Sequence, residues 1–393
     1  MTQAAAPDTD GAEVLLGAFD WQARTRLVYG PGLLARLGEL ASGLGAKRVL
    51  LVTDRGIVAA GHAGHAQRFL EQAGLTVVMD DQVRENPTTR DVARCVEIAR
   101  EGMVDAIVGL GGGSSMDTAK GCNFILTNGG EMKDYWGVGK AAKPMLPMIA
   151  IPTTAGTGSE CQSAALIADE ETHQKMACLD PKVAPRVAIL DPELTVSQPQ
   201  GVTACTGVDA LAHAVETAVT RKRTALSEVF SREAFRLCYH ALPQVLAEPG
   251  DLAARGRMQL GAAYAGLAIE NSMLGAAHSA ANPLTAHHGV AHGQAVGLVL
   301  PEVVRFNAVL ASARDGYLGL CASAGLAADV EGLASGLEQI LELAGLAGRL
   351  RDFGVTSEGI PALAEEAGRQ WTATFNPRGI GAEDFARIYE TLR

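Results

Sequence analysis

The chain has 393 residues, of which 48% are hydrophobic and 20% charged, a composition typical of a globular protein with a large core. Its formal net charge is −11, which argues against the basic surface that a nucleic-acid binder uses to neutralise phosphates. No apolar run approaches the roughly 18 residues of a membrane-spanning helix, so we expect no membrane partner.

Two features predict a cytoplasmic protein. The seven cysteines are scattered, odd in number and free of any CxxC pair, which is typical of reduced thiols. The first residues of the chain are acidic and lack a basic segment followed by an apolar one, so we expect no signal peptide.

The first half of the chain alternates apolar runs with segments of helical spacing. The predicted elements are strand 47–54, helix 65–73, strand 75–79, helix 91–100, strand 105–110 and strand 147–152. Continuous apolar strands separated by helices predict a parallel sheet that is covered on both faces.

The second half is helical almost throughout. Helices are predicted at 204–220, 224–246, 256–271 and 330–343. Two prolines in the segment 191–199 interrupt any regular element, so we place a domain boundary there. The expected fold is an α/β domain at 1–198 followed by an all-α domain at 199–393.

A glycine-rich turn at 111–115 follows a predicted strand and opens a helix. Glycines let the backbone approach a phosphate closely, and the free amides at the start of a helix point towards it. The turn matches neither the GxGxxG fingerprint nor the P-loop, and a glycine triplet alone is more often a plain flexible turn. It therefore indicates a phosphate ligand only together with other evidence.

Two further segments would lie near such a ligand. The loop 151–160 leaves another strand and carries small and hydroxyl-bearing residues that suit ribose and phosphate. Asp54 ends the first predicted strand, where a carboxylate can accept from both ribose hydroxyls and repel a 2′-phosphate. A helix cap is the simpler role for Asp54, and Arg55 beside it keeps NADP open as an alternative to NAD.

Asp209 and His213 are four residues apart on a predicted helix and therefore share one face. His278 and His292 follow in a histidine-rich stretch, and one carboxylate with three imidazoles is a ligand set for zinc or ferrous iron. A single Asp/His pair is usually a surface hydrogen bond, but apolar neighbours surround this one, and a buried carboxylate needs a partner. We expect a metal centre here, with Glu216 orienting His213.

These motifs, in this order, resemble the iron-containing (group III) alcohol dehydrogenases over nearly the whole chain. The segment 111–120 is similar to the family's GGGSxxDxAK motif, and 152–160 matches PTTAGTGSE letter for letter. Further matching blocks lie at 25–32, 86–88, 191–194, 206–213 and 376–378.

The resemblance implies a Rossmann-like NAD(P)-binding domain, a helical domain in a dehydroquinate synthase-like architecture, and an active site in the cleft between the two. It implies Fe²⁺ or Zn²⁺ held by Asp209, His213, His278 and His292. It also implies a homodimer or a larger homo-oligomer. The implied contacts with NAD(P) are Asp54, Asn86, Gly112, Gly113, Ser114, Asp117, Thr153, Thr154, Thr157, Lys175 and Leu194.

One position departs from the family pattern. Four residues after the first histidine of the His278 segment, many members carry a second histidine thought to relay protons, and Asn282 stands there. Because asparagine does not titrate, we expect His288, Thr285 or a water chain to take over, and we count His288 among the catalytic residues. The segment 283–288, expected as a loop, also lacks the aromatic residues common in the family.

The expected function is hydride transfer between NAD(P) and a small alcohol, aldehyde or ketone bound to the metal. A dehydroquinate synthase-like lyase or a glycerol-1-phosphate dehydrogenase needs a basic pocket, whereas segments 207–216 and 278–293 contain no lysine or arginine. Maleylacetate reductases work without this metal set. A non-catalytic cofactor-binding scaffold would need a lost ligand or a broken glycine turn. We find neither, but Asn282 keeps this alternative open.

Overall fold

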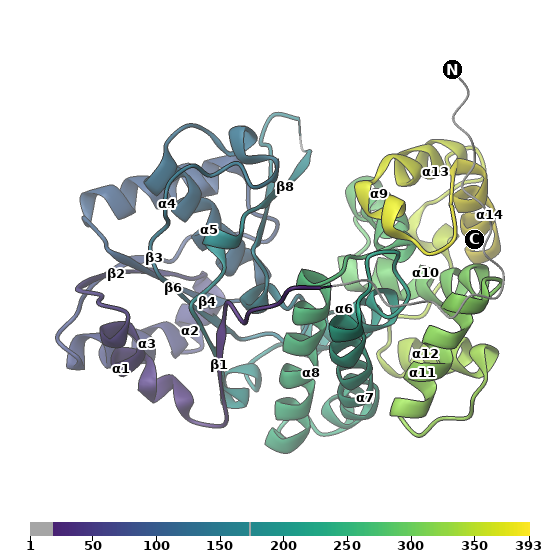
Figure 1. The fold of residues 1–393 in the computed structure, drawn as a ribbon, viewed down its shortest axis with the longest axis horizontal. Coiled ribbons are helices and arrows are strands. Elements are labelled where there is room, and N and C mark those ends of the chain that lie inside the picture. The colour runs from purple at the N-terminus through teal and green to yellow at the C-terminus, as the bar shows by residue number, and fades with distance from the viewer. Residues whose placement is uncertain (1–18, 173) are drawn as a thin grey trace.

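The computed structural model describes residues 19–172 and 174–393. A sheet with its covering helices forms one side of the molecule, and a second group of helices forms the other side (Figure 1). The larger sheet has six strands in the order β1-β9-β6-β4-β2-β3, and all of its pairings are parallel, as predicted. Its strands are β1 (Arg26–Tyr29), β2 (Arg48–Val52), β3 (Thr76–Asp80), β4 (Ala106–Gly111), β6 (Met148–Pro152) and β9 (Val187–Leu190).

Successive side chains of the central strands enter two different cores. Val49 and Leu51 of β2 pack on the face covered by α1 (Leu37–Gly43) and α3 (His62–Gln72). Leu50 and Val52 of the same strand pack on the opposite face, below α4 (Thr89–Glu101) and α5 (Gly113–Asn128). Both faces are therefore buried, which is why these strands are continuously apolar.

A second, three-stranded sheet was not predicted. It has the order β5-β8-β7, with β5 (Gly137–Val138), β7 (Ala164–Ala168) and β8 (Lys175–Leu179), and β7 runs antiparallel to β8. Ala165 and Ile167 of β7 face the core below α5. The sequence of β7 is short and apolar without polar alternation, so its pattern gave no signal for a half-buried strand.

The helical half is built around one continuous core. The four predicted helices are present as α6 (Gln200–Thr217), α7 (Ala225–Ala247), α8 (Leu252–Glu270) and α12 (Val330–Leu343). No helix among the described residues has the length and apolar composition needed to cross a bilayer. The helices that were not predicted are α9 (Ala276–His288), α10 (His292–Asn307), α11 (Ala311–Ser323), α13 (Ile360–Arg369) and α14 (Ala382–Leu392).

The expectation of a loop at 283–288 is wrong, because this segment is the second half of α9. Proline inside a helix removes one backbone hydrogen bond. Here Pro283 and Leu284 are both buried in the helical half, and this burial stabilises the helix through the proline.

The change from strands to helices falls within 191–199, between β9 and α6. Asp191 organises this junction, because its buried carboxylate accepts hydrogen bonds from the amides of Gly32 (3.1 Å), Leu34 (2.9 Å) and Glu193 (3.1 Å). The carboxylate thereby caps a short helical turn at Pro192–Thr195 and ties it to the loop after β1.

A fully buried lysine joins helix α5 to the loop that leaves β6. Lys120 on α5 donates from Nζ to the carbonyl of Ser159 (2.6 Å), to the hydroxyl of Ser159 (2.8 Å) and to the carbonyl of Ala164 (2.9 Å). The Ser159 hydroxyl in turn donates to Asp117 (2.8 Å). These contacts hold the loop after β6 against the first turns of α5.

We predict that Lys120→Met lowers the free energy of unfolding by roughly 3 kcal/mol, because it leaves Asp117 as a buried carboxylate without its cationic neighbour. Urea unfolding measures the change. Lys140→Met, at an exposed lysine, is the matched control and should lie within about 0.5 kcal/mol of the parent protein. Equal stability of the two variants would contradict the role given to Lys120.

Candidate metal centre and cofactor site

Four predicted ligands from three helices meet at one carboxylate oxygen. Oδ1 of Asp209 lies 3.4 Å from Nε2 of His213 and 3.3 Å from Nε2 of His278. It lies 3.9 Å from Nε2 of His292, the first residue of α10. The ligand atoms of Asp209, His278 and His292 all lie within 4.8 Å of one another, the spacing of groups around a single ion.

The burial of Asp209 and its histidine neighbours favours a bound cation at this position. Asp209 is 5% exposed and His278 4% exposed. Neither Oδ1 of Asp209 nor Nε2 of His278 has a hydrogen-bond partner among the described residues. A buried carboxylate without a partner is costly, and the set of one oxygen and three nitrogens fits zinc or ferrous iron.

Glu216 orients His278, and the expectation that it orients His213 is wrong. Its Oε2 lies 2.5 Å from Nδ1 of His278, and its Oε1 accepts from the amide of Ala277 (2.6 Å). The carboxylate therefore holds both the ring and the first turn of α9, and it leaves Nε2 facing Asp209. The i,i+3 spacing to His213 suggested the other partner, but α9 packs its N-terminus onto Glu216.

The surroundings set the charge of each group. Burial disfavours the charged form of Asp209, yet the three imidazoles hold the pKa of its carboxyl below the usual range. Burial lowers the pKa of His213. Desolvation, together with the nearby His278, also lowers the pKa of His292, although its side chain is 37% exposed. Against the effect of burial, Glu216 and Asp209 raise the pKa of His278 to about 9. At neutral pH the carboxylate is charged and two imidazoles are neutral, which are the forms that bind metals.

A buried amide pair, which sequence reasoning missed, fixes the start of α9. Asn307 and Asn376 exchange hydrogen bonds between their side chains, at 3.0 and 2.7 Å. Oδ1 of Asn376 also lies 3.4 Å from the amide of Ala276, the first residue of α9. Because α10 begins at His292 and ends at Asn307, the pair joins two ligand-bearing helices. Asn376 lies in a matching sequence block, but no role had been assigned to it.

The glycine turn and the loop after β6 are in contact. Gly111 has φ +146°, and a Cβ there would lie 2.5 Å from Oγ of Ser115. A Cβ on Gly113 would lie 2.9 Å from Cγ2 of Thr157, and one on Gly112 would lie 3.4 Å from Cγ2 of Thr154. The structure therefore brings Gly112, Gly113, Ser114, Thr153, Thr154 and Thr157 together at the start of α5.

Asp54 lies where its carboxylate can both cap a helix and face the ribose of a bound NAD. Its Oδ1 accepts from the amide of Ile57 (3.0 Å) and so caps α2 (Arg55–Ala59), as the simpler interpretation predicted. Its Oδ2 lies 3.5 Å from Oγ of Ser115, beside the glycine turn. Arg55 donates to the side-chain oxygen of Gln82 at 2.5 Å.

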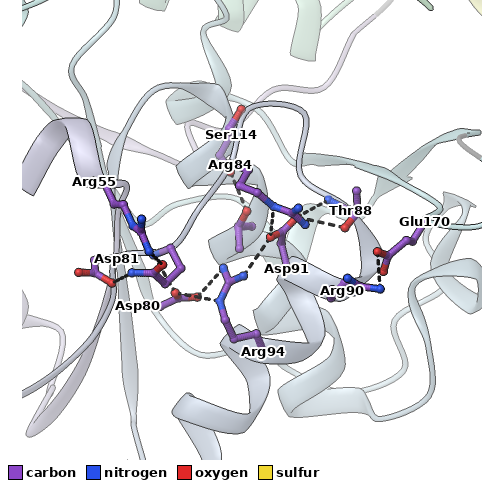
Figure 2. Close-up of polar contacts among 12 residues, drawn as sticks. Arg55, Asp80, Asp81, Arg84, Thr88, Arg90, Asp91, Arg94, Ser114 and Glu170 are labelled. Atoms are coloured by element: carbon purple, nitrogen blue, oxygen red, sulfur yellow. Dashed lines mark hydrogen bonds and ion pairs between the residues drawn. The ribbon is translucent and has the colours of Figure 1, made fainter.

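A charged network beside this end of the sheet fixes the loop that carries Asn86 (Figure 2). The buried Asp91 accepts from Arg84 at 3.0 and 3.1 Å and from Arg94 at 2.9 Å. Arg94 also reaches Asp80 at the end of β3 (3.2 Å). Burial disfavours the Asp91 carboxylate, but the two arginines and Thr88 lower its pKa to about 2. Asn86 itself is exposed, with φ +53°.

Three other predicted contacts lie apart from the glycine turn or are already engaged. Both oxygens of Asp117 accept hydrogen bonds within the protein, from Ser159 (2.8 Å) and from the amide of Leu166 (3.3 Å). Leu194 is buried in the core of the large sheet. Lys175 is exposed at the start of β8. The structure therefore gives Asp117 and Leu194 roles in the protein interior.

His288 does not join the metal centre, and its position argues against the catalytic role expected for it. It ends α9, ten residues after His278 and so about 15 Å further along the helix axis. Its Nδ1 contacts the carbonyl of Phe353 (3.1 Å). Asn282, one turn after His278, donates from its amide to Oε1 of Gln370 (3.1 Å).

We predict that Glu216→Gln raises the dissociation constant for Zn²⁺ about 10- to 100-fold, because His278 loses the carboxylate that orients it. Competition with a fluorescent chelator measures the constant. Glu366→Gln is the matched control, since Glu366 contacts the exposed His287 at the far end of the same helix (2.7 Å). Unchanged zinc affinity in Glu216→Gln would contradict the geometry described above.

Comparisons with known proteins agree with this architecture. Residues 24–192 match the family "Iron-containing alcohol dehydrogenase", and residues 203–392 match its C-terminal family. The NAD-dependent methanol dehydrogenase of Bacillus methanolicus is 35% identical, over 92% of this chain and 96% of that protein. The lactaldehyde reductase of Escherichia coli K12 is 33% identical over the same shares of the two chains.

Solved structures show the same dehydroquinate synthase-like fold. A 1,3-propanediol oxidoreductase superposes with a TM-score of 0.92 at 30% identity, covering 96% of this chain and all of that one. The sulfoacetaldehyde reductase of Bifidobacterium kashiwanohense, in complex with NAD⁺, has a TM-score of 0.88 at 30% identity, covering 96% and 99%. The chain belongs to the iron-containing alcohol dehydrogenase family of oxidoreductases.

Proposed function

We propose that this protein is an NAD-linked, metal-dependent dehydrogenase that interconverts a small alcohol with its aldehyde or ketone. The observation that carries the proposal is the convergence of three imidazoles on the buried Asp209 carboxylate. The glycine turn is linked to this centre, because Gly156 of the loop after β6 packs against Thr206, one turn before Asp209.

The residues that would hold the metal are Asp209, His213, His278 and His292. When bound, a divalent ion supplies a Lewis acid for the substrate oxygen, and NAD supplies the hydride acceptor. The side chain of His292 is 37% exposed, whereas those of His213 and His278 are each 6% exposed. The substrate would therefore approach from the side of His292.

The chain's own groups supply position and charge. Glu216 holds the Nδ1–H of His278, so Nε2 is the nitrogen that would release its proton when a cation binds. The amides at the start of α5 bind the pyrophosphate, because the helix has no side-chain cap there and glycines admit a close approach. The oxygens of Asp54 beside the turn favour the ribose of NAD over a 2′-phosphate.

Further proposals concern substrate, assembly and location. The relatives named above act, by their names, on methanol, lactaldehyde, 1,3-propanediol and sulfoacetaldehyde, so we propose a small alcohol or aldehyde as the substrate. We propose a homodimer or larger homo-oligomer in the cytoplasm, and a division into domains at 198/199. Seven unpaired cysteines support the cytoplasmic location.

We predict that Asp209→Ala and His278→Ala abolish both metal binding and NAD-dependent turnover, because each variant removes one ligand of a four-ligand set. Elemental analysis of the purified protein and absorbance at the NADH band with a panel of small alcohols measure the two effects. His287→Ala, at an exposed histidine, should keep both properties. Full metal content with normal turnover in either ligand variant would refute the assignment.

We also predict that His288→Gln leaves the pH dependence of turnover unchanged, because His288 lies about 15 Å along α9 from His278. A pH–rate profile of the variant against the parent checks this prediction. If the variant's pH–rate profile loses or shifts one limb, His288 takes part in the reaction.

A further inference from the structure

A buried arginine without an acidic partner lies away from the metal centre. Arg255, in the first turn of α8, is 3% exposed and donates from Nε to the carbonyl of Pro249 (2.6 Å). It forms no ion pair with any acidic residue that the structure describes, and burial lowers the pKa of its guanidinium with no carboxylate opposing the effect. A buried charge without a counter-charge is costly, so Arg255 calls for an anion.

A small cavity lies beside Arg255. Its polar lining comes from Thr195, Gln198, Thr203, Thr206 and Arg255. It has room for about one water-sized particle, since about 10 Å³ is open to the centre of such a particle. No aspartate or glutamate lines it, so its charge is that of the guanidinium alone.

Two further features of the cavity favour a negative occupant. Thr203 is 5% exposed, and its hydroxyl has no hydrogen-bond partner in the described parts of the chain. Thr203 and Thr206 belong to the first two turns of α6, which begins after Pro199 without a side-chain cap. The free hydroxyl of Thr203, near the start of α6, therefore lines the same cavity as the guanidinium.

Neighbouring polar groups are already satisfied. Gln198 donates to the hydroxyl of Thr206 (3.2 Å), which itself donates to the carbonyl of Val202 (2.8 Å). The hydroxyl of Thr195 donates to the carbonyl of Pro192 (2.8 Å). The hydroxyl of Thr203 is thus a lining donor left for a ligand, beside the guanidinium of Arg255.

We propose that this cavity is a halide site, in which one chloride ion is held by Arg255 and the Thr203 hydroxyl at the start of α6. The size of the cavity excludes sulfate, phosphate and organic anions. Both proposed donors belong to the helical half, on α6 and α8, so the bound ion would stabilise the packing of these two helices. This inference is independent of the proposed enzymatic function.

The test compares sodium chloride with sodium gluconate at equal, low ionic strength. For the parent protein, chloride should raise the melting temperature by several degrees more than gluconate, with saturation, because it binds only the folded state. Arg255→Met and Thr203→Val should both lose this difference. Arg257→Met, two residues further along α8 at a more exposed position, is the matched control and should keep it.

Crystals grown without halide and soaked in bromide give the second measurement. We expect an anomalous peak within about 3.5 Å of the Arg255 guanidinium in the parent protein and none in Thr203→Val or Arg255→Met. If Arg255→Met does not fold, Thr203→Val alone tests whether the cavity binds the halide. A water in the cavity, or a chloride response that survives in Thr203→Val and any folded Arg255→Met, would overturn the proposal and leave an adventitious ion only.

Discussion

The helical half of the molecule depends on how the buried negative charge of Asp209 is compensated. Asp209 lies inside the core built by α6 to α14, where an unpaired carboxylate would strongly oppose folding. Three imidazoles surround it, and two of them are kept neutral by burial, so they supply lone pairs instead of a full counter-charge. A divalent cation at this position would complete the group, and folding and metal binding would then be linked at this site.

The helices that bear the ligands are fixed to one another by buried polar contacts rather than by the ligands alone. Glu216 joins α6 to the first turn of α9, and the Asn307–Asn376 pair joins the first turn of α9 to the end of α10. On the other side of the molecule, Lys120 holds the loop after β6 to α5. Each tie uses a charged or amide side chain that is fully satisfied, which gives a unique geometry at low cost. The metal centre and the glycine turn are thereby held ready before any ligand arrives.

The elements that depend on local sequence patterns were predicted correctly. The parallel sheet, the helix with Asp209 and His213 on one face, and the glycine turn at the start of α5 all follow from periodicity and from residue type. The meeting of His278 and His292 with Asp209 depends on packing between helices. Residue types indicated a metal centre, and the resemblance to a known family assigned its four positions. Tertiary contacts also explain the errors: α9 continues through Pro283 and carries His288 away from the centre, and Glu216 faces a helix 60 residues later in the chain. The pairing of β7 with β8 has no signature in their short apolar sequences.

X-ray absorption at the metal edge of the protein as purified tests the central claim most directly. One carboxylate and three imidazoles predict a first shell of oxygen and nitrogen at about 2.0–2.2 Å, with the outer-shell scattering of histidine rings. The iron or zinc edge identifies the element. A sulfur shell at about 2.3 Å, or the absence of histidine scattering, would contradict the account.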